Sequence, residues 1–179
     1  MKHMEHDQMS VRILDAQDKP LNDGEIRMLA EIELHPKVQE WDTGAPTKDI
    51  EEMYRLFKKF FEELPKNEDQ IFLVAKAAKR VVGFVGIHRM SRLPHIGQVG
   101  VIVHPDYQSR GIGTQLLMAA IESARNKGFE RLEADTLAHN KPMIKLVKKV
   151  GFKFEGVRKM RIKRSGKYLD EALFAMTPH

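Results

Sequence analysis

The sequence predicts a mixed α/β fold, also describable as α+β, in which a mostly antiparallel central sheet carries helices on both faces. Three observations predict it: a strand–helix–strand unit in the middle of the chain, β-rich runs on both sides of that unit, and two helical segments that precede them. A strand–helix–strand unit forms a right-handed parallel crossover, whereas short turns join antiparallel strands. The sheet is therefore expected to contain one parallel step among antiparallel ones.

The N-terminal part of the chain predicts one strand and two helices. Residues 11–14 form a short apolar run, and residues 24–34 read as a helix that ends before Pro36, because a residue before proline avoids the helical region. A loop is expected over residues 38–46, and Thr47 is expected to cap a second helix. The apolar face of that helix repeats every three or four residues, which is typical of a helix packed on a core: Ile50, Met53, Tyr54, Phe57, Phe60, Phe61 and Leu64.

The remainder of the chain predicts six strands and two helices. Gly128 and Gly151 stand where helix C-caps are expected, and Ser165-Gly166 predicts a tight turn between the last two strands. One helix is expected over residues 111–127, and a shorter one is expected to begin at Asn140. The expected strands are residues 71–75, 81–87, 96–103, 131–137, 152–163 and 168–176.

Length and composition indicate a single domain over residues 11–179, because a hydrophobic fraction of 42% suffices for one buried core. Residues 1–10 are polar and are expected to form a disordered N-terminal segment rather than a signal peptide. No run reaches the roughly 18 apolar residues of a membrane span, so a cytoplasmic location is expected, without membrane partners. The chain has no cysteine, which excludes disulfides, thiolate zinc sites and a cysteine nucleophile, and no metal is expected.

The most informative stretch runs from Val101 to Thr114. A strand there ends at Pro105, a tight loop follows, and a helix begins near Gly111–Gly113. Backbone N–H groups at such a helix start converge on one point, where the helix dipole adds about half a positive charge, and this favours a phosphate or pyrophosphate. The two glycines let an anion approach the main chain, and Arg110 can add charge at the rim. The stretch is neither a Walker loop nor the three-glycine dinucleotide fingerprint.

Several motifs in the right order make the chain resemble the GNAT acetyltransferases over residues 70–176. The loop fits the family's Gln/Arg-x-x-Gly-x-Gly/Ala signature, and the end of the chain resembles the branch of ribosomal-protein and amino-acid N-acetyltransferases. The stretches that carry the resemblance are Gln108–Gly113 with its lead-in Val103–Tyr107, the second motif Asn140–Phe152, Glu155-Gly156, and Gly166–Glu171.

The resemblance implies the GNAT acyl-CoA N-acyltransferase fold, with acetyl-CoA (coenzyme A) as co-substrate. Backbone groups of the strand before the loop would pair with the pantetheine arm like an added strand. Asn140 would bond the pantetheine or an ordered water, or act only as a helix N-cap, and Lys149 would reach the cofactor or stand in solvent. The strand residues concerned are Val101, Ile102 and Val103, and the pyrophosphate loop consists of Gln108, Ser109, Arg110, Gly111, Ile112, Gly113 and Thr114.

Acetylation of an amine requires that an ammonium group with a pKa near ~10 loses a proton. Family members often use a glutamate on the strand before the loop as base and a tyrosine on the helix after the second motif's asparagine as acid. Here those positions hold Gln98 and Val147, and neither exchanges a proton at neutral pH. The direction of Asp135 on its strand stays open. The catalytic residues therefore stay open among Gln98, His95, His139 and Asn140.

These features predict an N-acetyltransferase that passes an acetyl group to a small-molecule amine, an amino acid or a protein N-terminus by direct attack in a ternary complex. The absent glutamate and tyrosine motivate one alternative, a non-catalytic acyl-CoA-binding module. Acidic residues around 31–42 would suit a cationic acceptor, and basic residues over 158–167 would suit an acidic one. Only Tyr168 lies near that basic cluster, which argues against nucleic acid as a partner. The resemblance also implies a homodimer.

Overall fold

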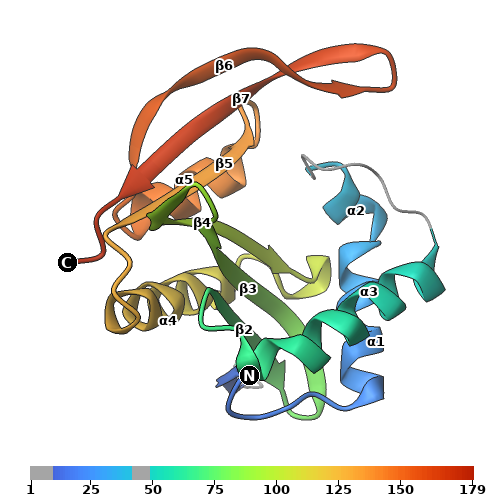
Figure 1. Ribbon diagram of the computed structural model, residues 1–179. Coiled ribbons are helices and arrows are strands. Elements are labelled where there is room, and N and C mark those ends of the chain that lie inside the picture. Colours follow the sequence, from blue (N-terminus) through green and yellow to red (C-terminus); the bar gives the residue numbers. More distant parts are fainter. Residues whose placement is uncertain (1–9, 42–48) are drawn as a thin grey trace, which may run out of the picture.

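Strands β1 to β7 lie in the order β1-β2-β3-β4-β5-β7-β6 within one seven-stranded sheet (Figure 1). This computed structural model describes residues 10–41 and 49–179. Every neighbouring pair of strands is antiparallel except β4–β5, which is parallel, so the expected mixed sheet is confirmed. The strands are β1 (Val11–Asp15), β2 (Gln70–Ala77), β3 (Arg80–Met90), β4 (Leu93–Val103), β5 (Arg131–Leu137), β6 (Lys153–Arg164) and β7 (Lys167–Met176).

Helices cover both faces of this sheet, as expected (Figure 1). On one face, α1 and α3 enclose a core with Leu29, Phe72 and Phe84, and on the other α4 and α5 pack over a core with Leu116 and Phe129. The helices are α1 (Asp23–Glu33), α2 (Pro36–Gln39), α3 (Ile50–Glu63), α4 (Ile112–Asn126) and α5 (Lys141–Lys149), with short 3₁₀ turns η1 (Leu64–Lys66) and η2 (Pro105–Tyr107).

The starts of the first three helices differ from the predictions. Helix α1 begins at Asp23 because Asn22 and Glu25 form a capping box, in which each side chain accepts a hydrogen bond from the other's backbone N–H at 3.0 Å. The predicted loop is wrong at its start, since α2 begins at Pro36, where the fixed φ of proline suits a first helical turn. Helix α3 is capped by Asp49, and the expected cap, Thr47, lies outside the described residues, as do residues 1–9.

Strands β4 and β5 pair only briefly and then diverge. Ile96–Gln98 pair with Arg131–Glu133, and the pairing stops there. Beyond that point β4 continues beside β3 as far as Val103, while β5 continues beside β7 as far as Leu137. Within the described residues no strand fills the gap, so one backbone edge of β4 over residues 99–103 faces a space between the two strands.

Gly97 lies where β4 and β5 meet, and we expect Gly97→Ala to reduce the free energy of unfolding by about 1–3 kcal/mol. A Cβ atom there would lie 2.7 Å from Ile87 Cγ2, 2.9 Å from Phe129 Cδ1 and 3.0 Å from Leu132 Cδ2. At Gly100, on the same strand, a Cβ meets nothing within 4 Å, so Gly100→Ala is the control, with an expected change below about 0.5 kcal/mol. Urea unfolding measures both variants, and equal losses would contradict the packing argument.

Candidate active site

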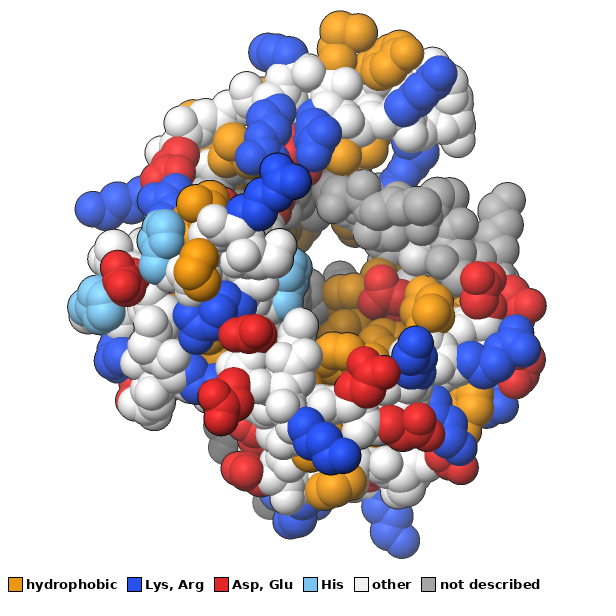
Figure 2. Space-filling view, in the orientation of Figure 1, with side chains coloured by type: hydrophobic (Ala, Val, Ile, Leu, Met, Phe, Trp, Pro, Cys, Tyr) orange, Lys and Arg blue, Asp and Glu red, His pale blue; other side chains and the backbone are white. Residues whose placement is uncertain are grey.

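A cleft of about 850 Å³ opens where β4 and β5 diverge. Strand β4, the loop before α4, strand β5 and helix α5 supply its walls, and α2 contributes to one side. Figure 2 shows this face of the molecule hollowed beneath the β6–β7 hairpin. The structure brings together all the residues predicted to bind the cofactor except Arg110: Val101, Ile102, Val103, Gln108, Ser109, Gly111, Ile112, Gly113, Thr114, Asn140 and Lys149.

The loop between β4 and α4 presents a row of backbone amides. Ser109 and Gly111 both have left-handed backbone conformations, with φ of 59° and 79°, and such residues curl a chain so that successive N–H groups converge. Helix α4 has no side-chain cap, and no acceptor among the described residues takes a hydrogen bond from the amides of residues 109–114. These N–H groups are therefore available to an anion at the start of a 15-residue helix.

The two loop glycines serve different purposes. Gly111 has a left-handed φ, which glycine adopts readily, and a Cβ there would meet nothing within 4 Å, so the space beside its main chain is open. At Gly113 a Cβ would lie 2.9 Å from Leu146 Cδ2 and 3.7 Å from Val103 Cγ2. Gly113 therefore lets α5 pack against the first turn of α4, a role that the sequence interpretation, which assigned both glycines to anion approach, had missed.

Two carboxamide side chains hold the walls of the cleft together. Gln108 Nε2 donates to the carbonyl oxygen of Val103 at 3.0 Å, which ties the loop to the end of β4. Asn140 is buried; its Oδ1 accepts from the Met143 amide at 3.2 Å, and its Nδ2 donates to Thr136 Oγ1 at 3.0 Å. Asn140 thus caps α5 and fixes that helix to β5 while it lines the cleft.

Asp135 is the only acidic side chain among the described residues that line the cleft. Its carboxylate accepts a hydrogen bond from Gln98 Nε2 and lies 3.6 Å from Arg158 Nη1. Burial raises the pKa of Asp135, and the nearby carboxylate of Glu171 raises it further, while Arg158 and Gln98 act in the opposite direction. A carboxylate with a raised pKa is a better proton acceptor than an ordinary aspartate. The sequence had left the direction of this side chain open, and in the structure Asp135 is one of the residues that line the cleft.

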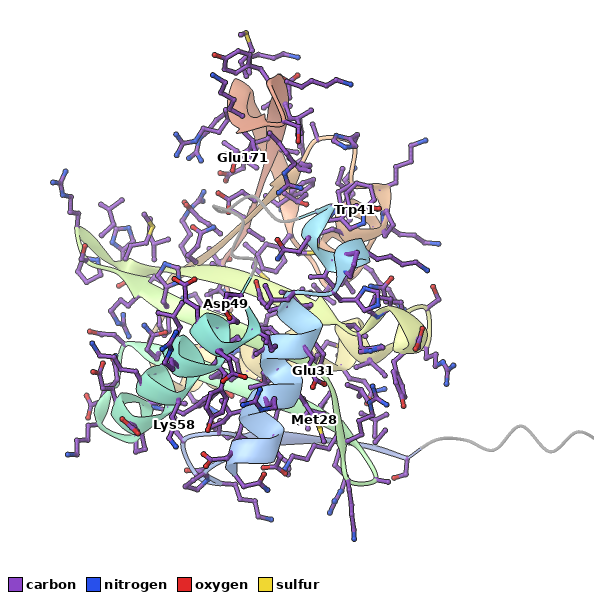
Figure 3. All side chains as sticks on the ribbon, turned by 90° about the vertical axis from the view of Figure 1, so that its right-hand side faces the viewer. Met28, Glu31, Trp41, Asp49, Lys58 and Glu171 are labelled. Carbon is purple, nitrogen blue, oxygen red and sulfur yellow. The ribbon has the colours of Figure 1, made fainter. Side chains whose placement is uncertain are left out.

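A β-bulge in the terminal hairpin places arginines beside the carboxylates of Asp135 and Glu171. The register of β6 against β7 shifts between Arg158 and Ile162, and the Met160 amide donates to Asp170 Oδ1 at 2.9 Å. Such a bulge redirects neighbouring side chains. Beside it, Arg158 Nη1 lies 3.0 Å and Arg161 Nε 3.6 Å from one oxygen of the buried Glu171, whose position Figure 3 shows. The sequence analysis missed this cluster because a bulge leaves no simple pattern in sequence.

The predicted histidines do not line the cleft. His95 is exposed near the other end of β4, where its carbonyl accepts from the Glu130 amide at 3.0 Å. His139 is exposed and lies against Trp41, with ring centroids 5.5 Å apart. We therefore set both aside as proton acceptors. Val147, at the position where relatives often have tyrosine, is buried in the core.

One side of the cleft is bounded by α2 and the residues that follow it, and the hairpin is tied to this segment. Val38 on α2 and Trp41, which follows that helix, line this side, and Figure 3 shows Trp41 beside α2. Arg164 Nη1 donates to the carbonyl oxygens of Gln39 at 2.6 Å and Glu40 at 2.9 Å, which links β6 to α2. Basic side chains gather over the hairpin (Figure 2): Arg158, Lys159, Arg161, Lys163, Arg164 and Lys167.

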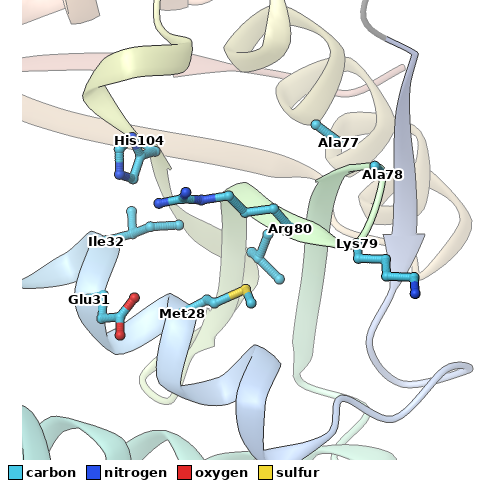
Figure 4. A pocket seen from close by; sticks show the side chains of 9 residues that line it. Met28, Glu31, Ile32, Ala77, Ala78, Lys79, Arg80 and His104 are labelled. Carbon is cyan, nitrogen blue, oxygen red and sulfur yellow. The ribbon is translucent and has the colours of Figure 1, made fainter.

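A smaller pocket of about 430 Å³ lies between α1, the β2–β3 turn and the end of β4 (Figure 4). Glu31, Arg80 and His104 supply its polar groups. Burial lowers the pKa of His104, and the Nδ1 atom of this ring accepts a hydrogen bond from the Asp106 amide at 3.2 Å, which requires an unprotonated Nδ1. None of the residues predicted to bind a cofactor or to act in catalysis lines this pocket.

Comparison with known proteins decides the family. Residues 28–152 match the acetyltransferase (GNAT) family. The chain belongs to this family. The resemblance inferred from the loop and the second motif is thereby confirmed. In the described part of this GNAT protein, no helix is long and apolar enough to cross a membrane, and no three His, Cys, Asp or Glu residues are grouped to hold a metal ion.

Among the proteins similar to this GNAT protein are two N-acetyltransferases and one solved structure. It is 33% identical over 101 residues to the L-amino acid N-acetyltransferase AaaT of Escherichia coli, covering 55% of this chain and 62% of that one. It is 34% identical over 99 residues to the N-alpha-acetyltransferase RimI of Mycobacterium tuberculosis, covering 53% and 60%. The alignments thus span less than two thirds of these relatives' lengths. The structure of yncA from Salmonella typhimurium with acetyl-CoA is 19% identical, covers 94% of each chain and has a TM-score of 0.77, which confirms the fold.

Proposed function

We propose that this GNAT protein transfers the acetyl group of acetyl-CoA to an amine. One observation carries the proposal: the gap between β4 and β5 joins an unpaired strand edge and a row of available amides to a half-buried carboxylate with a raised pKa. The strand edge suits an extended chain, the row of amides suits a pyrophosphate, and the carboxylate suits an ammonium group. Acetyl-CoA supplies the first two, together with the acetyl group as a thioester.

The residues present fit the coenzyme. Amides of residues 109–114 would hold the pyrophosphate, and the space beside Gly111, where a Cβ meets nothing, leaves room for its oxygens. Backbone groups of Val101 and Val103 would pair with the pantetheine arm along the β4 edge. Gln108 would act on the loop rather than on the coenzyme, because its amide nitrogen is bonded to Val103.

Asp135 would accept the proton that the amine must lose. Its carboxylate lines the same cleft, and its raised pKa brings it closer to the range in which it accepts a proton near neutral pH. The new nitrogen–carbon bond replaces the carbon–sulfur bond. The ammonium group gives one proton to Asp135 before the attack, and the second proton that the nitrogen loses as the amide forms passes through solvent to the leaving thiolate, so that the products are the amide and the free thiol. Gln98, which donates to the same carboxylate, would orient it rather than exchange a proton.

The similarity to an L-amino acid N-acetyltransferase and an N-alpha-acetyltransferase supports an α-amino group as the acceptor, on a free amino acid or on a protein N-terminus. An ammonium group would lie near Asp135, and the neighbouring Arg158 and Arg161 could face a carboxylate or a peptide carbonyl. The homodimer and the cytoplasmic location that the sequence suggested stay predictions.

A thiol-release assay tests this proposal. We expect free coenzyme A to appear when the protein is incubated with acetyl-CoA and amino acids or peptides with a free N-terminus, and not with the same peptides acetylated at the N-terminus. Binding of acetyl-CoA by calorimetry without turnover on any amine would instead favour the non-catalytic acyl-CoA-binding module. Absence of binding would reject the site itself.

A further inference from the structure

Two short stretches of the chain resemble each other in sequence and in structure. Residues 35–39 read His-Pro-Lys-Val-Gln, and residues 104–108 read His-Pro-Asp-Tyr-Gln. In each stretch the histidine precedes a short helix, α2 or η2, whose first residue is the proline. In each, the glutamine side chain donates to a backbone carbonyl oxygen earlier in the chain, at 2.8 Å in the first stretch and 3.0 Å in the second. The two stretches are therefore built alike, although they lie far apart in the chain.

Each histidine caps its short helix with its Nδ1 atom. His35 Nδ1 accepts from the Lys37 amide and His104 Nδ1 accepts from the Asp106 amide, both at 3.2 Å. An imidazole nitrogen accepts a hydrogen bond only when it carries no proton, so both rings are uncharged in this arrangement and carry their proton on Nε2. A proton added to Nδ1 would turn the acceptor into a donor that faces another donor, and the cap would be lost.

The two capping side chains contact each other. The imidazole rings of His35 and His104 lie with their centroids 5.5 Å apart and their planes inclined at 66°, which is an edge-to-face contact. The His104 amide also donates to the carbonyl oxygen of Val82 at 2.9 Å, which ties this residue to β3. Neither histidine is among the described residues that line the cleft, but Val38 on α2 and Tyr107 on η2 are. The contact between the rings therefore joins two walls of the cleft from outside it.

The surroundings of His104 favour its uncharged form. Burial lowers the pKa of His104, and Arg80 on β3 and His35 act in the same direction, while Asp106 on η2 and Glu31 on α1 oppose them. Figure 4 shows Arg80 and Glu31 at the same pocket as His104. If both rings took up a proton, their positive charges would also repel each other across the ring contact.

We propose that His35 and His104 are positioning residues, which hold α2 against the loop of residues 109–114 while both imidazole rings are uncharged. This inference rests on the proposed function, since it takes that loop, which follows η2, to bind the pyrophosphate of the coenzyme. Protonation would remove a cap and weaken the contact between the rings, so the loop would lose the fixed start that its amides need to converge on one anion. The affinity for coenzyme A is then expected to fall as the pH falls.

Calorimetric dissociation constants of coenzyme A at pH values of about 7.5 and about 5.5 test the proposal. In the unmodified protein, the lower pH is expected to weaken binding about five- to tenfold more than it does in the double variant His35→Asn, His104→Asn. Asparagine also caps a helix but does not titrate, and the titration of the coenzyme's own phosphates is common to both proteins. The control is His95→Asn, which removes an exposed histidine near the other end of β4 and is expected to keep the pH response of the unmodified protein.

The contact between the two rings has a readout of its own. His104→Ala lacks the cap at every pH and is expected to weaken coenzyme A about five- to tenfold at neutral pH, and His104→Asn is expected to restore most of that loss. His35→Ala is expected to weaken coenzyme A about threefold in the unmodified protein, through loss of the ring contact. The same change is expected to have no further effect in His104→Ala, where that contact is already gone.

Each contrary outcome is distinct. If the double asparagine variant keeps the pH response of the unmodified protein, or if His95→Asn loses it as fully, the uncharged pair is not what holds the loop and the proposal is overturned. If His35→Ala has no effect, or the same effect with and without His104, the two caps act independently and the pairing is overturned. In these cases binding of coenzyme A still supports the proposed function. If the alanine variants do not fold, the asparagine variants decide the question. If the unmodified protein binds coenzyme A at neither pH, the proposed function fails as well.

Discussion

Replacing Asp135 by Asn is expected to lower kcat/KM for amine acetylation by about 10²–10⁴-fold, the usual contribution of a positioned general base. The carboxamide has nearly the same shape and can still accept from Gln98, so the dissociation constant of coenzyme A is expected to stay the same. Steady-state kinetics and calorimetry measure the two quantities. Glu133→Gln is the control, because Glu133 lies on the same strand, pairs with Arg131 and does not line the cleft.

The pH dependence provides a second readout for Asp135. Because burial and Glu171 raise its pKa, the unmodified enzyme is expected to lose kcat/KM as the pH falls through a value above that of an ordinary aspartate, and the Asn variant is expected to lack this acid limb. The linked effect on stability has the opposite sense: a raised pKa stabilises the folded protein at low pH, and this contribution is lost as the pH rises through the folded-state pKa. Near-normal activity with an unchanged acid limb in Asp135→Asn would exclude Asp135 as the base.

Replacing Gly111 by Ala is expected to weaken the binding of coenzyme A by about ten- to hundredfold, which corresponds to the loss of one hydrogen bond to a charged group. The alanine side chain disfavours the left-handed φ of 79° that the backbone has just before α4. The amides of the loop would then no longer converge on one point. Calorimetry with coenzyme A measures the affinity, and urea unfolding measures the stability.

Gly128→Ala is the matched control for this variant. Gly128 follows the other end of α4, has a φ of 72°, and a Cβ there also meets nothing within 4 Å. Both substitutions are expected to reduce the free energy of unfolding by about 1–2 kcal/mol, but only the change at Gly111 is expected to alter the affinity. Equal affinities in the two variants would mean that the amide loop does not bind the coenzyme.

The sequence predicted the features that depend on local patterns. Helix periodicity, the Ser165-Gly166 turn and the glycine-containing loop all reside in short stretches, so the strands, the main helices and the predicted cofactor residues could be named before the structure was known. What sequence could not show depends on how distant strands meet. The orientation of Asp135 depends on the divergence of β4 from β5, and its neighbours Arg158 and Glu171 depend on a bulge in another pair of strands.

The packing role of Gly113 and the positions of Lys141 and Lys145 in the cleft were missed for the same reason. A glycine in a loop signature looks identical whether its missing side chain makes room for an anion or for a leucine of another helix. Likewise, Lys141 and Lys145 look like ordinary solvent-exposed charges until α5 is placed along the cleft. Asp49 caps α3, and the sequence pointed to Thr47 instead because threonine is also a favoured N-cap residue.

The divergence of β4 from β5 also affects the tendency of the protein to aggregate. A strand edge without a neighbour is a template on which other chains can assemble into aggregates, and residues 99–103 of β4 are largely apolar. A bound coenzyme would cover this edge and stabilise the folded protein. At a free concentration of 100 times Kd, ligand binding adds about 2.7 kcal/mol to the free energy of unfolding. The protein's lifetime would therefore rise and fall with the coenzyme A supply.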